Sequence, residues 1–463
     1  MRHGELVERI GDDAFCFGAW PSVFDADTLF ESSDRTGTAA LICNGQLVLL
    51  APSHPYSWLN LSRVDDDRLV VSNSLAFAMR ATGATPVPFI STYHADLNHI
   101  LFRPDRNLEI KLVGPSVQPL MLDAFRIDGN LVVHRERRAS AVRFDDFASY
   151  RDNVTEVLAG FAANATSTAR ATPFGLMATL SAGYDSSGSL TMAAPAGWNR
   201  AVTLVDDERT DVGTVIGEHL GVNVDEVSFD AWKARGPLQE VPFYTVSGPE
   251  ARLRFVGLED QVRHTLMITG GFGDASWDAS TDDIGPRYAQ VGSSAPGERS
   301  MNEWLLHVGT IALPVPALGA DDFDQFTRLS HSAEMREFRG TDGYDRPISN
   351  RLITEQKVPA EAMAKKKVAS AWLRGPMEFT PETRADFLAW VAEHPLPLRM
   401  TLDRLRSSPV ERAFHFAKAH HPNSKTMKRL RHLRKLNPSW TTGRLFHWAH
   451  DRISDHYPLS PFD

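Results

Sequence analysis

Ser181-Ala182-Gly183-Tyr184-Asp185-Ser186-Ser187 is the stretch of this 463-residue chain that decides its fold. It follows an apolar run, Leu176–Leu180, that predicts a buried strand, and it precedes a stretch compatible with a helix. Small residues at such a turn let backbone N–H groups approach an anion closely, and the N terminus of a helix favours negative charge. The pattern therefore predicts an anion-binding loop. For the loop taken alone, a Ser/Gly-rich turn with a helix cap is the alternative.

Asp185 is the unusual member of this loop, because a carboxylate beside phosphates repels them. A divalent cation such as Mg²⁺, placed between Asp185 and the phosphates, removes the conflict. The hydroxyls of Ser181, Ser186 and Ser187 are further candidate donors to a bound anion. The chain contains no Gly-x-x-x-x-Gly-Lys-Ser/Thr sequence, so the loop is not of the Walker type.

Strand and helix patterns alternate on both sides of the loop. Apolar residues at spacings of three and four predict an amphipathic helix over 147–161. This alternation predicts an α/β fold, in which helices cover the faces of a parallel sheet. Beyond Glu303 the chain is expected to be mostly helical. The other expected helices are 211–220 and 259–264, and the other expected strands are 201–205, 222–229 and 265–269.

Residues 1–140 have a different, β-rich pattern. Asn44-Gly45 separates two apolar runs and predicts a hairpin, because both turn residues tolerate positive φ. Further strands are expected over 68–71 and 131–134. We therefore expect two domains, 1–140 and 141–463.

The loop Ser181–Ser187 resembles the Ser-Gly-Gly-x-Asp-Ser pyrophosphate loop of the asparagine synthetase family, whose members cleave ATP between its α- and β-phosphates. Other segments resemble that family in the same order along the chain. Thr269-Gly270-Gly271-Phe272-Gly273-Asp274 falls where the family has Ser-Gly-Glu-Gly-Ala-Asp, and Lys365-Lys366-Lys367 is similar to its late Arg-x-Lys segment. The remaining similar segments are Val71–Ser74, Val205–Asp211, Ile216–Gly221, Tyr344–Pro347 and Val358–Pro359.

The resemblance implies a fold and a reaction. Residues 1–140 would form an N-terminal β-rich domain of the Ntn-hydrolase-like type. Residues 141–463 would form a PP-loop (adenine nucleotide α-hydrolase-like) parallel-sheet domain with a helical C-terminal part. The implied enzyme is an ATP-dependent carbon–nitrogen ligase. It would activate a small-molecule or peptide carboxylate as an acyl-adenylate, release AMP and pyrophosphate, and form an amide with an amine or ammonia.

The resemblance also implies the residues of the site, with ATP and Mg²⁺ as cofactors. The implied nucleotide-binding residues are Ser181, Gly183, Asp185, Ser186, Ser187 and Gly270. The implied magnesium ligands are Asp185 and Asp274, and the implied catalytic residues are Lys365 and Lys367. Without the other motifs, the lysines at 365–367 would be interpreted as a solvated basic helix face.

The chain departs from the family at the position of the glutaminase nucleophile, where it has Arg2 instead of cysteine. Cys16 and Cys43 are internal, so neither can use an N-terminal amine as its own base. We expect both to be buried core cysteines. The N-terminal domain is therefore predicted to be a degenerate glutaminase-like domain that does not hydrolyse glutamine.

Three further departures bear on catalysis. Ala182 stands where the family usually has glycine, and it would be strained if that position requires positive φ. Gly271 and Ala275 stand where the family carries glutamates. A catalytically degenerate binding or scaffold protein therefore stays an alternative. A nucleotide- or RNA-modifying PP-loop enzyme is another, although its sulfur-transfer branch generally needs more reactive cysteines than this chain has.

Composition restricts the partners. The net charge of -9 gives no overall attraction to nucleic acid or anionic membranes, and two cysteines fit a reducing compartment. No apolar run approaches the ~20 residues that span a bilayer, and Met1–Glu5 lacks a signal-peptide pattern. A cytoplasmic protein is expected, and a homodimer is left open. The basic stretch 412–450 is interpreted as a helix packed by its aromatic side chains rather than as a site for RNA or lipid.

Overall fold

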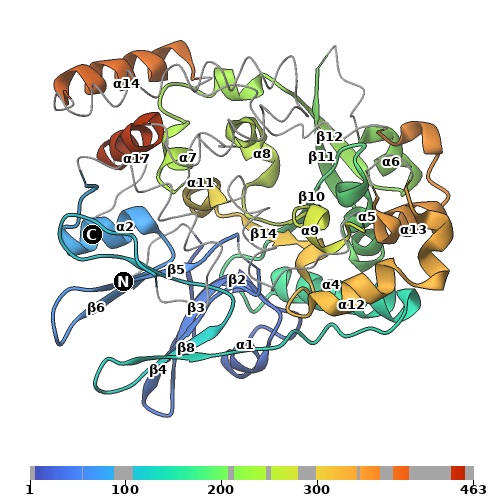
Figure 1. Ribbon diagram of the computed structural model, residues 1–463, viewed down its shortest axis with the longest axis horizontal. Coiled ribbons are helices and arrows are strands. Elements are labelled where there is room, and N and C mark those ends of the chain that lie inside the picture. Colours follow the sequence, from blue (N-terminus) through green and yellow to red (C-terminus); the bar gives the residue numbers. More distant parts are fainter. Residues whose placement is uncertain are drawn as a thin grey trace, which may run out of the picture.

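The computed structural model describes residues 6–54, 56–87, 108–206, 213–246, 252–279, 299–340, 345–364, 379–395 and 440–453. Figure 1 shows the antiparallel strands of the N-terminal third, in blue, beside the parallel strands and their helices, in green to orange. The structure therefore has the α/β character that the sequence predicts.

The N-terminal third of the chain forms two antiparallel sheets, as its β-rich pattern predicts. One has six strands in the order β1-β2-β3-β4-β8-β9, and the other has three in the order β6-β5-β7. Leu49, Leu61 and Phe125 belong to the core between the two sheets. Val48, one residue from Leu49, points to the opposite face and packs with Leu29 of α1. The strands are β1 Glu8–Ile10, β2 Ala14–Ala19, β3 Thr36–Cys43, β4 Gln46–Leu50, β5 Leu59–Arg63, β6 Leu69–Ser72, β7 Gln118–Leu120, β8 Ala124–Ile127 and β9 Val133–Glu136. The helices are α1 Ala26–Glu31 and α2 Leu75–Thr82.

Two turns in these sheets depend on positive φ. The predicted hairpin at Asn44-Gly45 is confirmed: the two residues have φ of 52° and 73° and join β3 to β4. The strand expected from Leu131 instead begins at Val133, because Leu131 has a φ of 58° and belongs to the preceding turn. The carboxylate of Asp128 stabilises that turn by accepting from the backbone N–H groups of Asn130 and Val132, at 2.9 and 3.0 Å.

A five-stranded sheet in the order β12-β11-β10-β13-β14 forms the centre of the rest of the chain, and every neighbouring pair in it is parallel. Four of its strands match the predicted ones within two residues. The fifth, β14, lies in a stretch that was expected to be mostly helical. Its four residues are all buried and so show no alternation of polar and apolar positions. The strands are β10 Gly175–Thr179, β11 Arg200–Val205, β12 Asn223–Ser228, β13 Thr265–Thr269 and β14 Ile311–Pro314.

Helices cover both faces of the parallel sheet. Ala178 and Leu266 point to one face, where the core includes α4, α5, α12 and α13. Their neighbours Met177 and Met267 point to the other, where it includes α7, η3, α8 and α11. The α-helices of this part are α4 Phe147–Ala165, α5 Tyr184–Ala193, α6 Thr214–His219, α7 Val241–Tyr244, α8 Glu259–Val262, α9 Gly273–Ser276, α11 Asn302–Val308, α12 Phe323–Ser330, α13 Pro347–Glu355, α14 Pro381–Glu393 and α17 Trp440–Arg452. The 3-10 helices are η1 Ala194–Ala196, η2 Ala231–Ala234, η3 Leu253–Leu258, η4 Val315–Ala317, η5 Ala333–Phe338 and η6 Ala360–Ala362.

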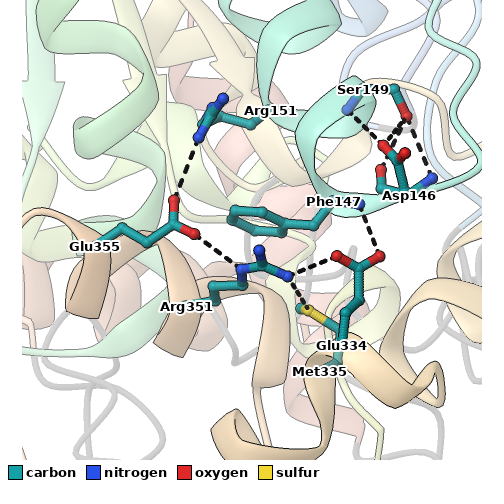
Figure 2. Close-up of polar contacts among 8 residues, drawn as sticks. All are labelled: Asp146, Phe147, Ser149, Arg151, Glu334, Met335, Arg351 and Glu355. Atoms are coloured by element: carbon teal, nitrogen blue, oxygen red, sulfur yellow. Dashed lines mark hydrogen bonds and ion pairs between the residues drawn. The ribbon is translucent and has the colours of Figure 1, made fainter.

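A polar network fixes α13 against the N terminus of α4 (Figure 2). The guanidinium of Arg351 lies 4.1 Å from the centre of the Phe147 ring and bonds to Glu334 and Glu355, at 2.7 and 2.9 Å. The other oxygen of Glu334 accepts from the backbone N–H of Phe147 at 3.1 Å, while Asp146 caps the helix. The network joins α13 to α4 through Phe147 and to η5 through Glu334.

The C-terminal helix α17 is packed by its aromatic side chains. Phe446 and Trp448 are fully buried, and the Trp448 indole N–H donates to Asp386 of α14 at 2.7 Å. The interpretation of the basic stretch as a packed helix is therefore confirmed for 443–450. Residues 412–439 lie outside the described part of the chain.

Candidate functional site

The loops that follow β10 and β13 meet at the carboxyl end of the parallel sheet. A Cβ on Gly270 would lie 2.3 Å from the backbone nitrogen of Ser186, and one on Gly273 would lie 2.5 Å from Cγ of Asp185. Side chains at these two glycines would therefore separate the loops. The chain runs outward from β10 to β11 and β12 on one side, and β13 and β14 lie on the other. Open α/β sheets bind ligands at such a switch point.

The predicted loop Ser181–Ser187 is held in shape by its own hydroxyls. The hydroxyls of Ser181 and Ser186 lie 3.0 Å apart, and Ser181 also accepts from the backbone N–H of Gly183 at 3.1 Å. Ser187 is fully buried and donates to the Ser181 carbonyl at 3.1 Å. The structure thus brings the predicted loop residues together, and it gives the hydroxyls a role in the loop itself. Their predicted role as donors to a ligand stays a prediction.

The N terminus of α5 begins directly in this loop. Gly183 is the N-cap residue and, having no side chain, makes no side-chain cap to the helix. The first backbone N–H groups of a helix have no acceptor within it, and they attract anions together with the helix dipole. The sequence predicts this arrangement through its small residues, and the ten-residue helix that follows fits the prediction.

Ala182, which replaces the usual glycine of the family, is not strained. It is fully buried and does not belong to the residues with positive φ. Its carbonyl accepts from the backbone N–H of Ala364 at 2.8 Å. This bond attaches the segment after α13 to the loop, immediately before the predicted catalytic residues. Lys365 and Lys367 themselves lie outside the described residues.

The two predicted metal ligands lie in the first turns of two neighbouring helices. Asp185 belongs to α5 and its side chain keeps 17% of its surface exposed, while Asp274 belongs to α9 and is exposed. Gly273, the residue before Asp274, packs against the carboxylate of Asp185. In the described part of the chain, no group of three or more His, Cys, Asp and Glu side chains is arranged for a metal ion. Mg²⁺ is usually bound by one or two carboxylates together with phosphate oxygens and water, so a site for it does not need three protein ligands.

Arg346 is a member of the site that the sequence did not single out. It is 5% exposed, and its Nε lies 3.4 Å from Oδ1 of Asp185 while its Nη1 lies 2.7 Å from Oδ2 of Asp278. The only signal in the sequence is the segment Tyr344–Pro347, which resembles the family without indicating a partner. Arg346 and Asp185 are far apart in the sequence, so their contact depends on the packing of α13 on α5.

Tyr56 fills the space in front of Gly271. A Cβ on Gly271 would lie 2.7 Å from Oη of Tyr56, and the Tyr56 ring also contacts Phe272 edge-on. Phe272 has a φ of 77°, a conformation that is costly for a bulky residue and that is kept by its burial. The place where the asparagine synthetase family, which the sequence resembles, carries a glutamate is thus occupied by a phenol from the N-terminal part of the chain.

A small pocket lies between the six-stranded sheet and the α11–β14 region, with a cavity volume of about 30 Å³. His54 in its wall is a structural link. The Thr36 hydroxyl donates to the Ala312 carbonyl at 2.6 Å and so accepts from Nε2 of His54, at 2.8 Å. Nδ1 of His54 accepts from the Tyr56 N–H at 3.3 Å. Burial lowers the pKa of His54 to about 3, so the ring is neutral.

The cysteines differ in burial. Cys16 is buried as expected, and burial raises the pKa of its thiol to about 12, which makes it a poor nucleophile. Cys43 was also expected to be buried but is only half-buried, because it lies at the hairpin end of β3. Position 2, where the family has its nucleophile, lies outside the described residues.

A scan against models of known protein families finds no match, and a search of curated proteins finds none either. In the described ranges, no helix has the length and apolar character needed to cross a membrane.

Proposed function

We propose that this chain is an ATP-dependent carbon–nitrogen ligase of the asparagine synthetase type. The observation that supports this most is the contact between the two loops at the switch point of the sheet, where Gly270 and Gly273 lie against Asp185 and Ser186. The two loops are the two most specific segments of the sequence resemblance. Their meeting unites an uncapped helix N terminus with two carboxylates, which is a combination suited to a metal-bound polyphosphate.

The proposed reaction has two steps. A carboxylate oxygen of the acyl substrate attacks the α-phosphorus of ATP, the bond from that phosphorus to the bridging oxygen breaks, and pyrophosphate leaves with the electron pair. The amine nitrogen then attacks the acyl carbon, AMP leaves with its oxygen, and the proton of the amine passes to a base or to solvent. The amide, AMP and pyrophosphate are the products.

The chain's own residues would act by binding and by stabilising charge. The backbone N–H groups at the start of α5 would bind the phosphates, and Asp185 and Asp274 would hold Mg²⁺, which neutralises the departing pyrophosphate. The bond between Ala364 and Ala182 brings the chain to this loop one residue before Lys365. Lys365 and Lys367, which lie outside the described residues, would meet the same charge.

The N-terminal part would be a degenerate glutaminase-like domain that supports the site without hydrolysing glutamine. The buried Cys16 is not a suitable nucleophile, because burial raises the pKa of its thiol to about 12. Tyr56 of this part reaches Gly271 in the loop after β13. The acceptor would then be free ammonia or an amine substrate.

A second candidate is a catalytically degenerate binding protein on the same fold. The observation that favours it is the space at Gly271, which lacks the carboxylate of the family and is filled by Tyr56. Such a protein would bind nucleotide without turning it over, or would bind none.

Pyrophosphate and AMP release with ATP, Mg²⁺ and a panel of carboxylates and amines tests the proposal. We expect the two products in equal amounts, and we expect Asp185→Asn to lower the rate at least about a hundredfold by removing a metal ligand. Asp324→Asn is the matched control, because Asp324 is an exposed acid in the first turn of α12 and lies outside the site. Formation of ADP and phosphate would refute attack at the α-phosphorus. Nucleotide binding without turnover would support the binding protein instead.

A further inference from the structure

Arg346 joins the two sides of the switch point. Its guanidinium contacts Asp185, in the first turn of the helix after β10, and Asp278, which follows the short helix after β13. The contact with Asp278 is the closer one, at 2.7 Å against 3.4 Å. A planar guanidinium can bind two carboxylates on different edges at once, whereas an ammonium acts as a single point of charge. Arg346 therefore has the geometry to fix the two acids relative to each other.

The backbone around Arg346 is itself firmly held. The carboxylate of the preceding residue, Asp345, accepts from Nε of Arg339 at 2.5 Å and from the N–H of Gly340 at 2.8 Å. The carbonyl of Asp345 accepts from the N–H of Ala279, the residue after Asp278, at 3.0 Å. Arg346 thus begins from an anchored position at the N terminus of α13.

Helix α13 is fixed against α5 by a close contact. The Ser349 hydroxyl donates to the Tyr184 carbonyl, and a Cβ on Gly188 would lie 2.4 Å from that hydroxyl oxygen. The distance between Arg346 and Asp185 therefore follows from helix packing and is not adjustable by a flexible loop. At 5% exposure, Arg346 is also shielded from the water that would weaken its charge interactions.

The Asp185 carboxylate is partly enclosed by the site. Oδ1 is buried, faces Arg346, and lies where a side chain on Gly273 would collide with it. The Asp185 side chain nevertheless keeps 17% of its surface exposed. An ion pair at one oxygen of an aspartate restricts the orientation of its carboxylate.

We propose that Arg346 is a positioning residue of the candidate site, which holds the carboxylates of Asp185 and Asp278 so that Asp185 would be oriented to hold a phosphate-bound magnesium ion. This inference rests on the proposed function and deepens it. Arg346 acts through Asp185 and is not a ligand of the phosphates. Residues that contact a metal ligand without binding the metal themselves typically lower metal affinity by roughly ten- to a hundredfold when they are mutated.

Calorimetry of ATP binding at a series of Mg²⁺ concentrations tests this inference without relying on turnover. We expect Arg346→Gln to raise the Mg²⁺ concentration needed for half-maximal binding by about tenfold. Arg346→Lys keeps the charge but cannot contact both carboxylates at once. The Mg²⁺ concentration that it needs for half-maximal binding should lie between those of the wild type and Arg346→Gln. Asp278→Asn should shift the Mg²⁺ dependence in the same direction while leaving Arg346 in place, so the inference stays testable if Arg346→Gln does not fold.

A double-mutant cycle distinguishes positioning from direct binding. If Arg346 acts through Asp185, Arg346→Gln adds no further loss in an Asp185→Asn background. Arg351→Gln is the matched control, since Arg351 lies on the same helix but contacts Glu334 and Glu355, and it should leave the Mg²⁺ dependence unchanged. Additive losses of Mg²⁺-dependent ATP binding in the double variant would overturn this inference but not the proposed function. An Arg346→Gln protein with the wild-type Mg²⁺ dependence would do the same. A wild-type protein that binds no Mg·ATP would overturn the proposed function together with it.

Discussion

Gly270 follows β13 and Gly273 begins α9, and both positions need glycine because there is no space for a side chain. Neither has positive φ, so backbone freedom is not the reason for glycine there. The reason is the approach of the neighbouring loop, whose backbone at Ser186 occupies the space of a Cβ on Gly270.

Gly270→Ala is therefore expected to lower the free energy of unfolding by about 1–3 kcal/mol, the usual cost of forcing an extra methyl into a closed space. It should also weaken ATP binding, because the loops must move apart. Urea denaturation measures the first effect and calorimetry the second. Gly129→Ala is the control, since a Cβ there has no heavy atom within 4 Å. Equal stability of the two variants would argue against close packing of the loops.

The single residues of the site differ in how far the sequence could predict them. Ser181, Gly183 and Asp185 are found from the sequence because the chemistry of a strand–loop–helix turn is local. Arg346 could not be found in this way, since its partners depend on how α13 packs against α5. The same holds for Tyr56, which reaches Gly271 from another part of the chain.

At the scale of elements, the Arg351 side chain joins α13 to the N terminus of α4. Arg351→Ala removes two ion pairs and the stacking on Phe147 in a side chain that is only 20% exposed (Figure 2). It also leaves Glu334 without its closest cation. We expect a loss of about 1–3 kcal/mol in the free energy of unfolding, measured by urea denaturation.

The comparison for this variant is Arg151→Ala. Arg151 binds the same Glu355, at 3.3 Å, but is 41% exposed, and exposed pairs contribute about 0–1 kcal/mol. The stability should therefore change little. If Arg151→Ala were as destabilising as Arg351→Ala, burial and stacking would not be what gives the network its strength.

Elements with a clear local pattern were predicted well. The apolar spacing of α4 and the Asn44-Gly45 hairpin both follow from interactions among near neighbours in the sequence. β14 was missed because a short, fully buried strand has no periodicity to distinguish it from a buried helix. Its pairing with β13 is a property of the sheet and not of its own four residues.

At the scale of the molecule, buried polar links join the N-terminal sheets to the part that carries the candidate site. Arg170, before β10, bonds to Glu8 of β1 at 2.5 Å, and the Ser74 hydroxyl at the start of α2 donates to the buried Glu303 of α11 at 2.8 Å. The His54–Thr36 pair reaches the Ala312 carbonyl of β14. The two parts are thus tied through groups that are buried.

His54 makes this junction sensitive to acid. Burial lowers its pKa from 6.5 to about 3 in the folded protein, whereas the unfolded chain protonates it near 6.5. Above pH 6.5 His54 is mostly neutral in both the folded and the unfolded state, so it contributes little to the pH dependence of stability. As the pH falls below 6.5, the unfolded state binds a proton that the folded state excludes, so stability decreases by up to about 1.4 kcal/mol per pH unit.

Urea denaturation between about pH 5 and about pH 6.5 should therefore give a flatter pH dependence for His54→Gln than for the wild type, by up to about 1.4 kcal/mol per pH unit at the acid end. The slope is the test, because the substitution can also change stability uniformly at every pH. His450, whose pKa burial lowers to about 4, provides an independent comparison at the contact of α17 with the Thr245 carbonyl. His450→Gln should flatten the profile similarly, and the double variant should show both effects added. An unchanged slope in His54→Gln would mean that water reaches this junction and that the two parts of the molecule are less tightly joined there than the hydrogen bonds of His54 imply.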